Sequence, residues 1–216
     1  MFKNFKDCFS NGLTTRNQIQ IYSNVLPKDF FEKAQNIVKN GKEYAASVGT
    51  ADDRRIDLKI RDAYHIIDEN NEDYLKIKDY MKQTMFDCLF NYLQITNYIA
   101  YVDIEKFVID SSLNFIAYRP NSAGYLEHVD AFFRDSTLHE RLFSCVYYLN
   151  DDFVGGDLYF PRLNKKIKVK KNSIVVFPSS CLFSHVGLRL GRGRKVICPA
   201  WFGYKMNKAI DFQPII

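Results

Sequence analysis

The sequence predicts an α+β fold whose core is a double-stranded β-helix, the jelly-roll or cupin-like architecture, with N-terminal helices packed on one face. Two stretches before residue 100 have helical periodicity, whereas the part after it holds seven or eight short runs rich in β-branched and aromatic residues. No helical stretch separates those runs. With 216 residues, 47% of them apolar, the chain is long enough for a sizeable core, and we expect one domain over residues 1–216.

The first part, residues 1–110, is predicted to be a mainly helical support. The stretch "IQIYSNVL" near residues 18–26 and the stretch 63–68 are predicted strands, and polar residues 41–55 lack a period and are a predicted loop. "PKDFFEKAQNIVKN" predicts a helix that starts near Pro27. Its apolar residues follow helical spacing and comprise Phe30, Phe31, Ala34, Ile37 and Val38. A longer helix is predicted over residues 72–95, with an apolar face formed by Tyr74, Leu75, Ile77, Tyr80, Met81, Met85, Cys88 and Leu89.

The second part, about residues 111–204, is the predicted jelly-roll core. Turn signals such as "RPNSAG", "NDDFVGG" and "RLGRG" divide it into short segments. Gly155 and Gly156 are assigned to one of these turns and to no chemistry. The segments predicted as strands are "SLNFIAYR", "RLFSCVYYLN", "GDLYFPR", "KIKVK", "SIVVFP", "FSHVGL" and "RKVICPAWFGY".

Composition narrows the setting of the protein. Five cysteines, an odd number without CxxC spacing, indicate free thiols in a reducing compartment, and we expect a cytoplasmic location. No apolar run approaches the ~20 residues of a membrane span, and the first residues lack the apolar region of a secretory signal. The formal net charge of +5 comes from scattered lysines, and no motif combines basic with stacking residues, so we expect neither a membrane nor a nucleic-acid partner.

Four histidines are present, and one of them suggests a metal site. In "GYLEHVDA", His128 and Asp130 stand two residues apart, so on a strand both side chains point to the same side. A second histidine would complete the two-histidine, one-carboxylate facial triad of non-heme Fe(II) oxygenases. His185, in a strand-like run near the end of the core, is the best candidate, while His65 and an apparent-loop His139 are taken as structural or surface residues.

Two basic residues follow His185 at a useful distance. A dicarboxylate such as 2-oxoglutarate needs a fixed cation for its distal carboxylate, which Arg194 or Lys195 can provide. Strand alternation separates the two possibilities but does not choose between them. Lys195, Ile197, Pro199 and Trp201 share one side of the strand, and Arg194, Val196 and Cys198 share the other.

The ordered motifs "GYLEHVDA", "ERLFSCVYYLN", "GGDLYFPRL" and "FSHVGLRLGRGRKVICPAWF" resemble the prolyl 4-hydroxylase branch of the Fe(II)/2-oxoglutarate dioxygenases. The resemblance is strong over residues 112–204 and looser toward the N-terminus. It implies that an iron ion is held by the catalytic residues His128, Asp130 and His185. It also implies residues that bind 2-oxoglutarate or the peptide substrate: Lys195 (with Arg194 as the alternative), Tyr118 and Tyr148 for 2-oxoglutarate, and Arg141 and Trp201 for the peptide.

The activity implied by this resemblance is hydroxylation of a prolyl residue at C4 in a peptide or protein, with O2 consumed and 2-oxoglutarate converted to succinate and CO2. Ascorbate is expected as a further cofactor. Residues 43–60 are expected to form a lid over the mouth of the site. Two departures concern substrate choice: Arg189 replaces a proline common in the family, and no histidine follows Trp201. Other possibilities are the same chemistry on another side chain, a free amino acid or a nucleobase, a non-catalytic jelly-roll binding module, and a structural protein with a chance HxD.

Overall fold

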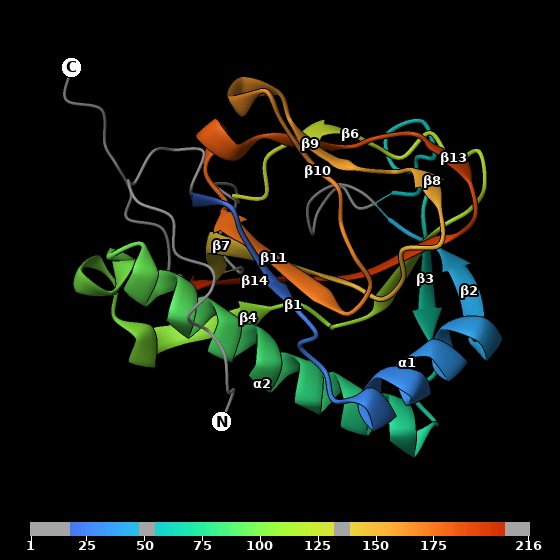
Figure 1. The fold of residues 1–216 in the computed structure, drawn as a ribbon, viewed down its shortest axis with the longest axis horizontal. Coiled ribbons are helices and arrows are strands. Elements are labelled where there is room, and N and C mark those ends of the chain that lie inside the picture. The colour runs from blue at the N-terminus through green and yellow to red at the C-terminus, as the bar shows by residue number, and fades with distance from the viewer. Residues whose placement is uncertain (1–17, 48–54, 132–138, 206–216) are drawn as a thin grey trace.

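Two antiparallel sheets face each other, and two helices cover the outer face of the larger sheet (Figure 1). The computed structural model describes residues 18–47, 55–131 and 139–205. The helices are α1 (Lys28–Asn40) and α2 (Glu72–Ile95), with short 3-10 turns at Tyr98–Tyr101, Ile104–Lys106, Pro161–Leu163 and Cys181–Phe183. The predicted jelly roll with helices on one face is confirmed.

The larger sheet collects strands from both halves of the chain. Its order is β1 (Gln20–Ser23), β11 (Ser173–Pro178), β7 (His139–Tyr148), β14 (Lys195–Lys205), β5 (Phe115–Tyr118), β3 (Tyr64–Ile67) and β2 (Lys42–Ala45), with β4 (Phe107–Asp110) paired to β14. The smaller sheet has the order β10 (Lys165–Ile167), β9 (Leu158–Phe160), β12 (His185–Gly187) and β6 (Tyr125–His128), and β13 (Leu190–Arg192) pairs with β8 (Val154–Gly155).

The long helix α2 begins and ends at clear sequence signals. The Asn71 side chain accepts hydrogen bonds from the backbone N–H groups of Asp73 and Tyr74 and so caps the first turn. The helix stops at Thr96, and Asn97 follows with a left-handed φ of 61°. Its buried stripe packs against the larger sheet and comprises Tyr74, Ile77, Met81, Thr84, Met85, Cys88, Leu89, Tyr92 and Leu93.

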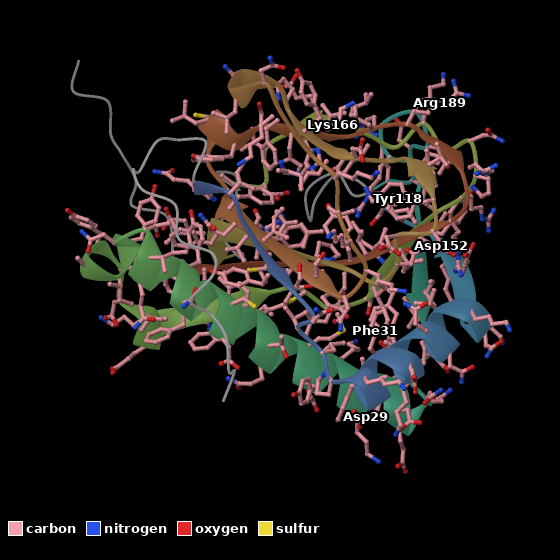
Figure 2. The ribbon with its side chains drawn as sticks, viewed as in Figure 1. Asp29, Phe31, Tyr118, Asp152, Lys166 and Arg189 are labelled. Carbon is pink, nitrogen blue, oxygen red and sulfur yellow. The ribbon has the colours of Figure 1, made fainter. Side chains whose placement is uncertain are left out.

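Strand alternation divides the core into two layers. On β14, Val196, Cys198 and Ala200 face the helices, while Lys195 and Ile197 face the space between the sheets. The inner layer is completed by residues such as Tyr118, which Figure 2 places between the two sheets. The side chains that could perform chemistry are therefore on the side of the larger sheet that faces the smaller one.

The N-terminal part supplies strands as well as helices: the predicted strands correspond to β1 and β3, and β2 and β4 also join the larger sheet. Two predictions about this part need correction. Residues 42–45, predicted as part of a loop, form β2 and pair with β3. Leu75, predicted on the buried stripe of α2, is 45% exposed, because the helix turns it away from the sheet.

Candidate functional site

The pairing of two short strands brings the predicted metal ligands together. His128 ends β6 and His185 begins β12, and the two are direct partners in the antiparallel register of these strands. Asp130 follows β6 by two residues, and the N–H of Ala131 donates to the carbonyl of Ser179, which fixes the chain just beyond it. Residues far apart in the sequence thus meet at one point of the smaller sheet.

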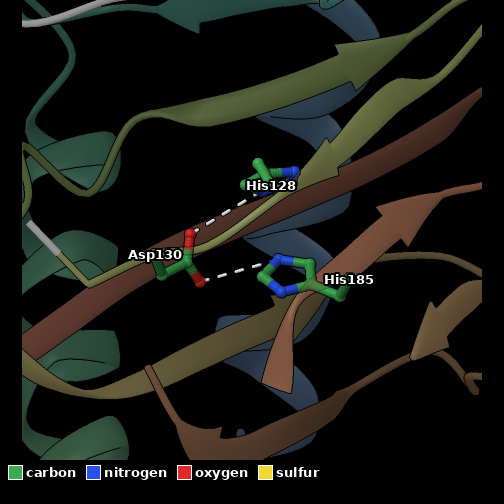
Figure 3. Close-up of side chains that lie close together, drawn as sticks. All are labelled: His128, Asp130 and His185. Carbon is green, nitrogen blue, oxygen red and sulfur yellow. Dashed lines mark ion pairs between the residues drawn. The ribbon is translucent and has the colours of Figure 1, made fainter. Parts of the chain in front are cut away.

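The three side chains point at one another (Figure 3). One ligand atom from each of His128, Asp130 and His185 lies within 4.8 Å of the others. The Nε2 atom of His128 is 3.7 Å from Oδ1 of Asp130. The Nε2 atom of His185 is 3.6 Å from Oδ2 of the same aspartate. A metal ion placed among these atoms would contact two imidazole nitrogens and one carboxylate.

Hydrogen bonds at the opposite ring nitrogens orient both imidazoles. Nδ1 of His128 lies 2.7 Å from the carbonyl of Leu126, and Nδ1 of His185 lies 3.1 Å from the carbonyl of Phe183. A carbonyl can only accept, so in neutral imidazoles Nδ1 carries the proton and Nε2 keeps its lone pair for a metal. Asp130, only 7% exposed, accepts a 2.8 Å hydrogen bond from the hydroxyl of Ser144.

The surroundings also favour the protonation states that bind metals. Burial, with help from the charge of His185, lowers the pKa of His128 to about 4 although Asp130 opposes this shift. Burial raises the pKa of Asp130, but the two histidines and hydrogen bonds from Ser144 and Trp201 outweigh it, so the pKa is lowered overall. Near neutral pH, His128 is therefore neutral and Asp130 is ionised. The donor set fits Fe(II) in chemistry, orientation and charge.

A cavity of about 650 Å³ opens beside this trio, a size typical of small-molecule sites. The inner face of β14 supplies part of its wall. The three metal-ligand candidates line the cavity together with every residue predicted to contact 2-oxoglutarate or substrate on this side of the sheet: Tyr118, Tyr148, Arg141, Lys195 and Trp201.

Lys195 is the buried cation of this cavity. It is 4% exposed, and its Nζ donates to the carbonyl of Gly156 at 2.6 Å and lies 5.3 and 5.4 Å from the ring centroids of Tyr118 and Tyr148. Burial lowers the pKa of its ammonium group to about 8, although Asp157 partly opposes the shift. Gly156, assigned to a turn alone, therefore also holds this lysine, and a Cβ atom there would lie 3.2 Å from the lysine's Cδ.

Arg194, the residue just before β14, points away from the cavity and does not line it. Its guanidinium donates to the carbonyl of Val38, at the end of α1, and to the carboxylate of Glu43 on β2. Strand alternation turns Arg194 outward and Lys195 inward, and this placement favours Lys195 as the cation for 2-oxoglutarate.

Arg141 and Trp201 form one unit in the cavity wall. The guanidinium carbon of Arg141 is 3.8 Å from the Trp201 ring centroid, and its Nε is 2.6 Å from a carboxylate oxygen of Asp110. Trp201 also lies close enough to Asp130 to help lower the pKa of its carboxyl group. The candidate substrate surface is thus connected directly to a metal-ligand candidate.

Sequence reasoning missed several cavity residues. His65, taken as structural, lines the cavity because it pairs with Ile116 on the inner face of the larger sheet, and Arg61 and Asn114 also line it. Only the strand register reveals these positions, since none belongs to a motif. His139, predicted in a loop, begins β7. Of the predicted lid over 43–60, residues 48–54 lie outside the described part of the chain, and residues up to Ala45 form β2.

Comparison with known proteins agrees with this geometry. Residues 113–203, which include all three metal-ligand candidates, match the family model described as the 2OG-Fe(II) oxygenase superfamily. Over 71 residues the chain is 34% identical to a protein of Acanthamoeba polyphaga mimivirus named "Putative prolyl 4-hydroxylase". This match covers 29% of the present chain and 29% of the viral protein, so the chain spans less than a third of that relative.

Solved structures share the fold. A viral collagen prolyl hydroxylase from Paramecium bursaria Chlorella virus-1, in its 2OG complex, has a TM-score of 0.56 at 17% identity, over 88% of this chain and 97% of the other. A prolyl hydroxylase from Trichoplax adhaerens in complex with a hypoxia inducible factor peptide fragment has a TM-score of 0.62 at 18% identity, over 86% and 83%. A Pseudomonas putida prolyl-4-hydroxylase has a TM-score of 0.58 at 22% identity, over 87% and 93%. At these identities the likeness establishes the fold.

Proposed function

We propose, from the premise that residues 113–203 form a 2OG-Fe(II) oxygenase domain, that the protein hydroxylates a prolyl residue at C4 in a peptide or protein. The reaction would convert the prolyl C–H group, O2 and 2-oxoglutarate into the prolyl C–OH group, succinate and CO2. The observation that carries the proposal is the joint placement of His128, Asp130 and His185 beside the buried cation Lys195 in one cavity.

The three clustered side chains would hold Fe(II) through the Nε2 atoms of His128 and His185 and a carboxylate oxygen of Asp130. A bound Fe(II) would supply the redox chemistry that activates O2, and the electrons that reduce O2 would come overall from the decarboxylation of 2-oxoglutarate and from the oxidised C–H bond. The chain keeps the imidazole of His128 neutral, orients both imidazoles through backbone carbonyls, and holds Asp130 ionised through the neighbouring histidines and the hydroxyl of Ser144.

Lys195 would bind the distal carboxylate of 2-oxoglutarate. Its ammonium group is buried and has no carboxylate partner among the described residues, so an incoming carboxylate would compensate its charge. Tyr118 and Tyr148, which flank it, would add hydrogen bonds from their hydroxyl groups. The cavity also has room for a substrate side chain next to the metal ligands.

A peptide substrate is supported by the fold neighbour whose structure contains a peptide fragment, and a prolyl target by the name of the mimivirus relative. In the present chain, the stacked Arg141 and Trp201 offer a flat, charged surface to such a peptide. Asp110 and Trp201 hold the arginine in place, so this surface is preformed.

The test is to supply Fe(II), 2-oxoglutarate and a panel of proline-containing peptides. We expect one added oxygen on a peptide by mass spectrometry, C4 hydroxyproline by NMR, and an equal amount of succinate. His128→Ala should abolish both products. Lys195→Ala should raise the 2-oxoglutarate concentration required, whereas Lys166→Ala, which removes a peripheral lysine of β10, should not (Figure 2).

Two outcomes would contradict parts of the proposal. Succinate without any oxidised peptide would exclude the prolyl target and favour another side chain, a free amino acid or a nucleobase. A protein that forms no succinate under any of these conditions would be a binding module and not an oxygenase.

Three finer points are also part of this proposal. The four described cysteines, Cys88, Cys145, Cys181 and Cys198, are free thiols, which supports a reducing, cytoplasmic location. Ascorbate is proposed as a reductant from the family resemblance alone. Neither helix in the described part of the chain is long and apolar enough to cross a membrane.

A further inference from the structure

We propose that Arg61 binds a carboxylate of the substrate, so that the protein favours peptides with an Asp, a Glu or a C-terminal carboxylate close to the oxidised residue. The inference rests on the proposed function, because it assigns one more contact between the same cavity and its peptide. It follows from the place of Arg61, from its stacking, and from its lack of a charged partner.

Arg61 is fixed against the strand that carries His128. It forms an isolated β-bridge with Tyr125, the first residue of β6, and the next N–H along β6, that of Leu126, donates to the carbonyl of Ile60. The Arg61 N–H itself donates to the carbonyl of Asp57 at 2.9 Å. With its backbone held on both sides, the half-buried side chain lines the cavity.

Tyr125 lies between Arg61 and the metal site. The guanidinium carbon lies 5.0 Å from the ring centroid of Tyr125. The Tyr125 ring in turn stacks on the imidazole of His128, with 3.7 Å between centroids and 23° between planes. An anion held by Arg61 would therefore lie one aromatic layer away from a proposed iron ligand.

Arg61 differs from the other two cations of the cavity. Arg141 is paired with Asp110, and the buried Lys195 is assigned to 2-oxoglutarate. Arg61 forms no ion pair with any carboxylate in the described part of the chain, and its Nε is buried without a hydrogen-bond acceptor. The buried Nε leaves the side chain without compensation inside the protein, and a carboxylate could approach the terminal N–H groups, which are not among the buried unpaired atoms.

The carboxylate at Arg61 would come from the substrate and not from 2-oxoglutarate. Lys195 belongs to β14 of the larger sheet, whereas Arg61 is bridged to β6 of the smaller one. The distal carboxylate of 2-oxoglutarate is already assigned to Lys195, and its other carboxylate would lie toward the metal. An extended peptide advances about 3.3 Å per residue, so a carboxylate at Arg61 would belong to a residue near the oxidised one.

The experiment uses uncharged peptides with a single proline, in which one Asp is moved through each position near that proline. Matched peptides carry Asn instead, and another pair ends in a free or an amidated C-terminus. Binding is measured by fluorescence anisotropy on the full chain with saturating 2-oxoglutarate and Mn(II). Mn(II) is used because it allows binding without turnover. Oxidation of the same peptides is measured with Fe(II).

At one or two positions we expect the carboxylate to tighten binding by about tenfold, which corresponds to about 1.4 kcal/mol. Arg61→Gln should remove this preference, and Arg61→Lys should keep most of it. Arg192→Gln, which removes an exposed arginine on β13 outside the cavity, is the matched control and should retain the full preference.

The proposal is overturned if no carboxylate position changes binding to the wild-type protein, a result that needs no variant to fold. It is also overturned if the preference persists in Arg61→Gln. Peptides oxidised equally well with Asp and with Asn would refute this inference and leave the proposed function intact. Conversely, Arg61-dependent binding without oxidation would support the inference and refute prolyl hydroxylation.

Discussion

Asp130 is the residue on which the proposed metal site depends most. Its carboxylate lies between two imidazoles, is almost inaccessible to solvent, and accepts a hydrogen bond from Ser144. Burial alone would favour its neutral form, which binds metals poorly. The two neighbouring histidines reverse this effect with help from Ser144 and Trp201, so residues that would not touch the metal also contribute to holding it.

Ser144→Ala tests this contribution. Loss of the hydroxyl should weaken Mn(II) binding roughly tenfold, the lower end of the usual effect of removing a partner that supports a metal ligand. Isothermal titration calorimetry measures the change. Ser179→Ala is the control, because the Ser179 hydroxyl contacts Ser144 and not the carboxylate, and it should weaken binding less. Equal affinity of Ser144→Ala and wild type would contradict the prediction.

Lys195 predicts a pH dependence of 2-oxoglutarate binding. Its pKa in the folded protein is lowered to about 8, so the ammonium is fully present only below that pH. A dicarboxylate needs the charged form, and its affinity should therefore fall as pH rises through 8, approaching tenfold per pH unit above it. The measurement is the dissociation constant of 2-oxoglutarate at saturating Mn(II).

Lys195→Arg provides the control for this pH series. An arginine stays charged over the whole range, so the decline should disappear even if the absolute affinity changes with the shape of the side chain. A wild-type affinity that is constant between about pH 7 and pH 9 would show that Lys195 does not bind the carboxylate.

At the scale of elements, the site depends on how closely β6 approaches β12. Gly124, just before β6, has a φ of 87°, and a Cβ atom there would lie 2.0 Å from the carbonyl oxygen of Gly187 on β12. Any side chain at this position would push apart the two strands that carry His128 and His185. The glycine is needed for both its conformation and its small size.

Gly124→Ala should therefore lower the free energy of unfolding by about 3 kcal/mol and also weaken Mn(II) binding. Urea unfolding and calorimetry measure the two effects. Gly191→Ala is the control: its nearest neighbour would be the carbonyl of Val154 at 3.4 Å, an ordinary contact, and its cost should stay below about 1 kcal/mol. Loss of stability with unchanged metal affinity would mean that strand spacing does not set the site.

The elements differ in how well the sequence predicts them. Helix α2 was predicted over its observed range, because its apolar period persists for 24 residues. The short strands β2, β4, β8 and β13 were missed, because they are defined by pairing with partners outside their own sequence and not by a local pattern. Register decides which side chains share a face, so the choice between Lys195 and Arg194, and the positions of Arg61 and His65, required the structure.

At the scale of the whole molecule, the two proposed ligands would join the two sheets. The metal-ligand candidates lie on or beside β6 and β12 of the smaller sheet, whereas Lys195 lies on β14 of the larger one. A 2-oxoglutarate molecule that contacts the metal and Lys195 would therefore connect the sheets across the cavity. Metal and 2-oxoglutarate should then stabilise the fold cooperatively.

Thermal unfolding tests this cooperativity. A ligand that binds at about 100 times its dissociation constant stabilises the protein by about 2.7 kcal/mol, so binding should show as a clear rise in Tm. We expect Mn(II) alone to raise Tm, 2-oxoglutarate alone to have little effect, and the two together to exceed the sum of their separate shifts. Lys195→Met should keep the metal shift and lose the further rise, and His128→Ala should lose both. If 2-oxoglutarate raised Tm equally with and without Mn(II), its binding would not involve the metal, and the sheets would not be joined through it.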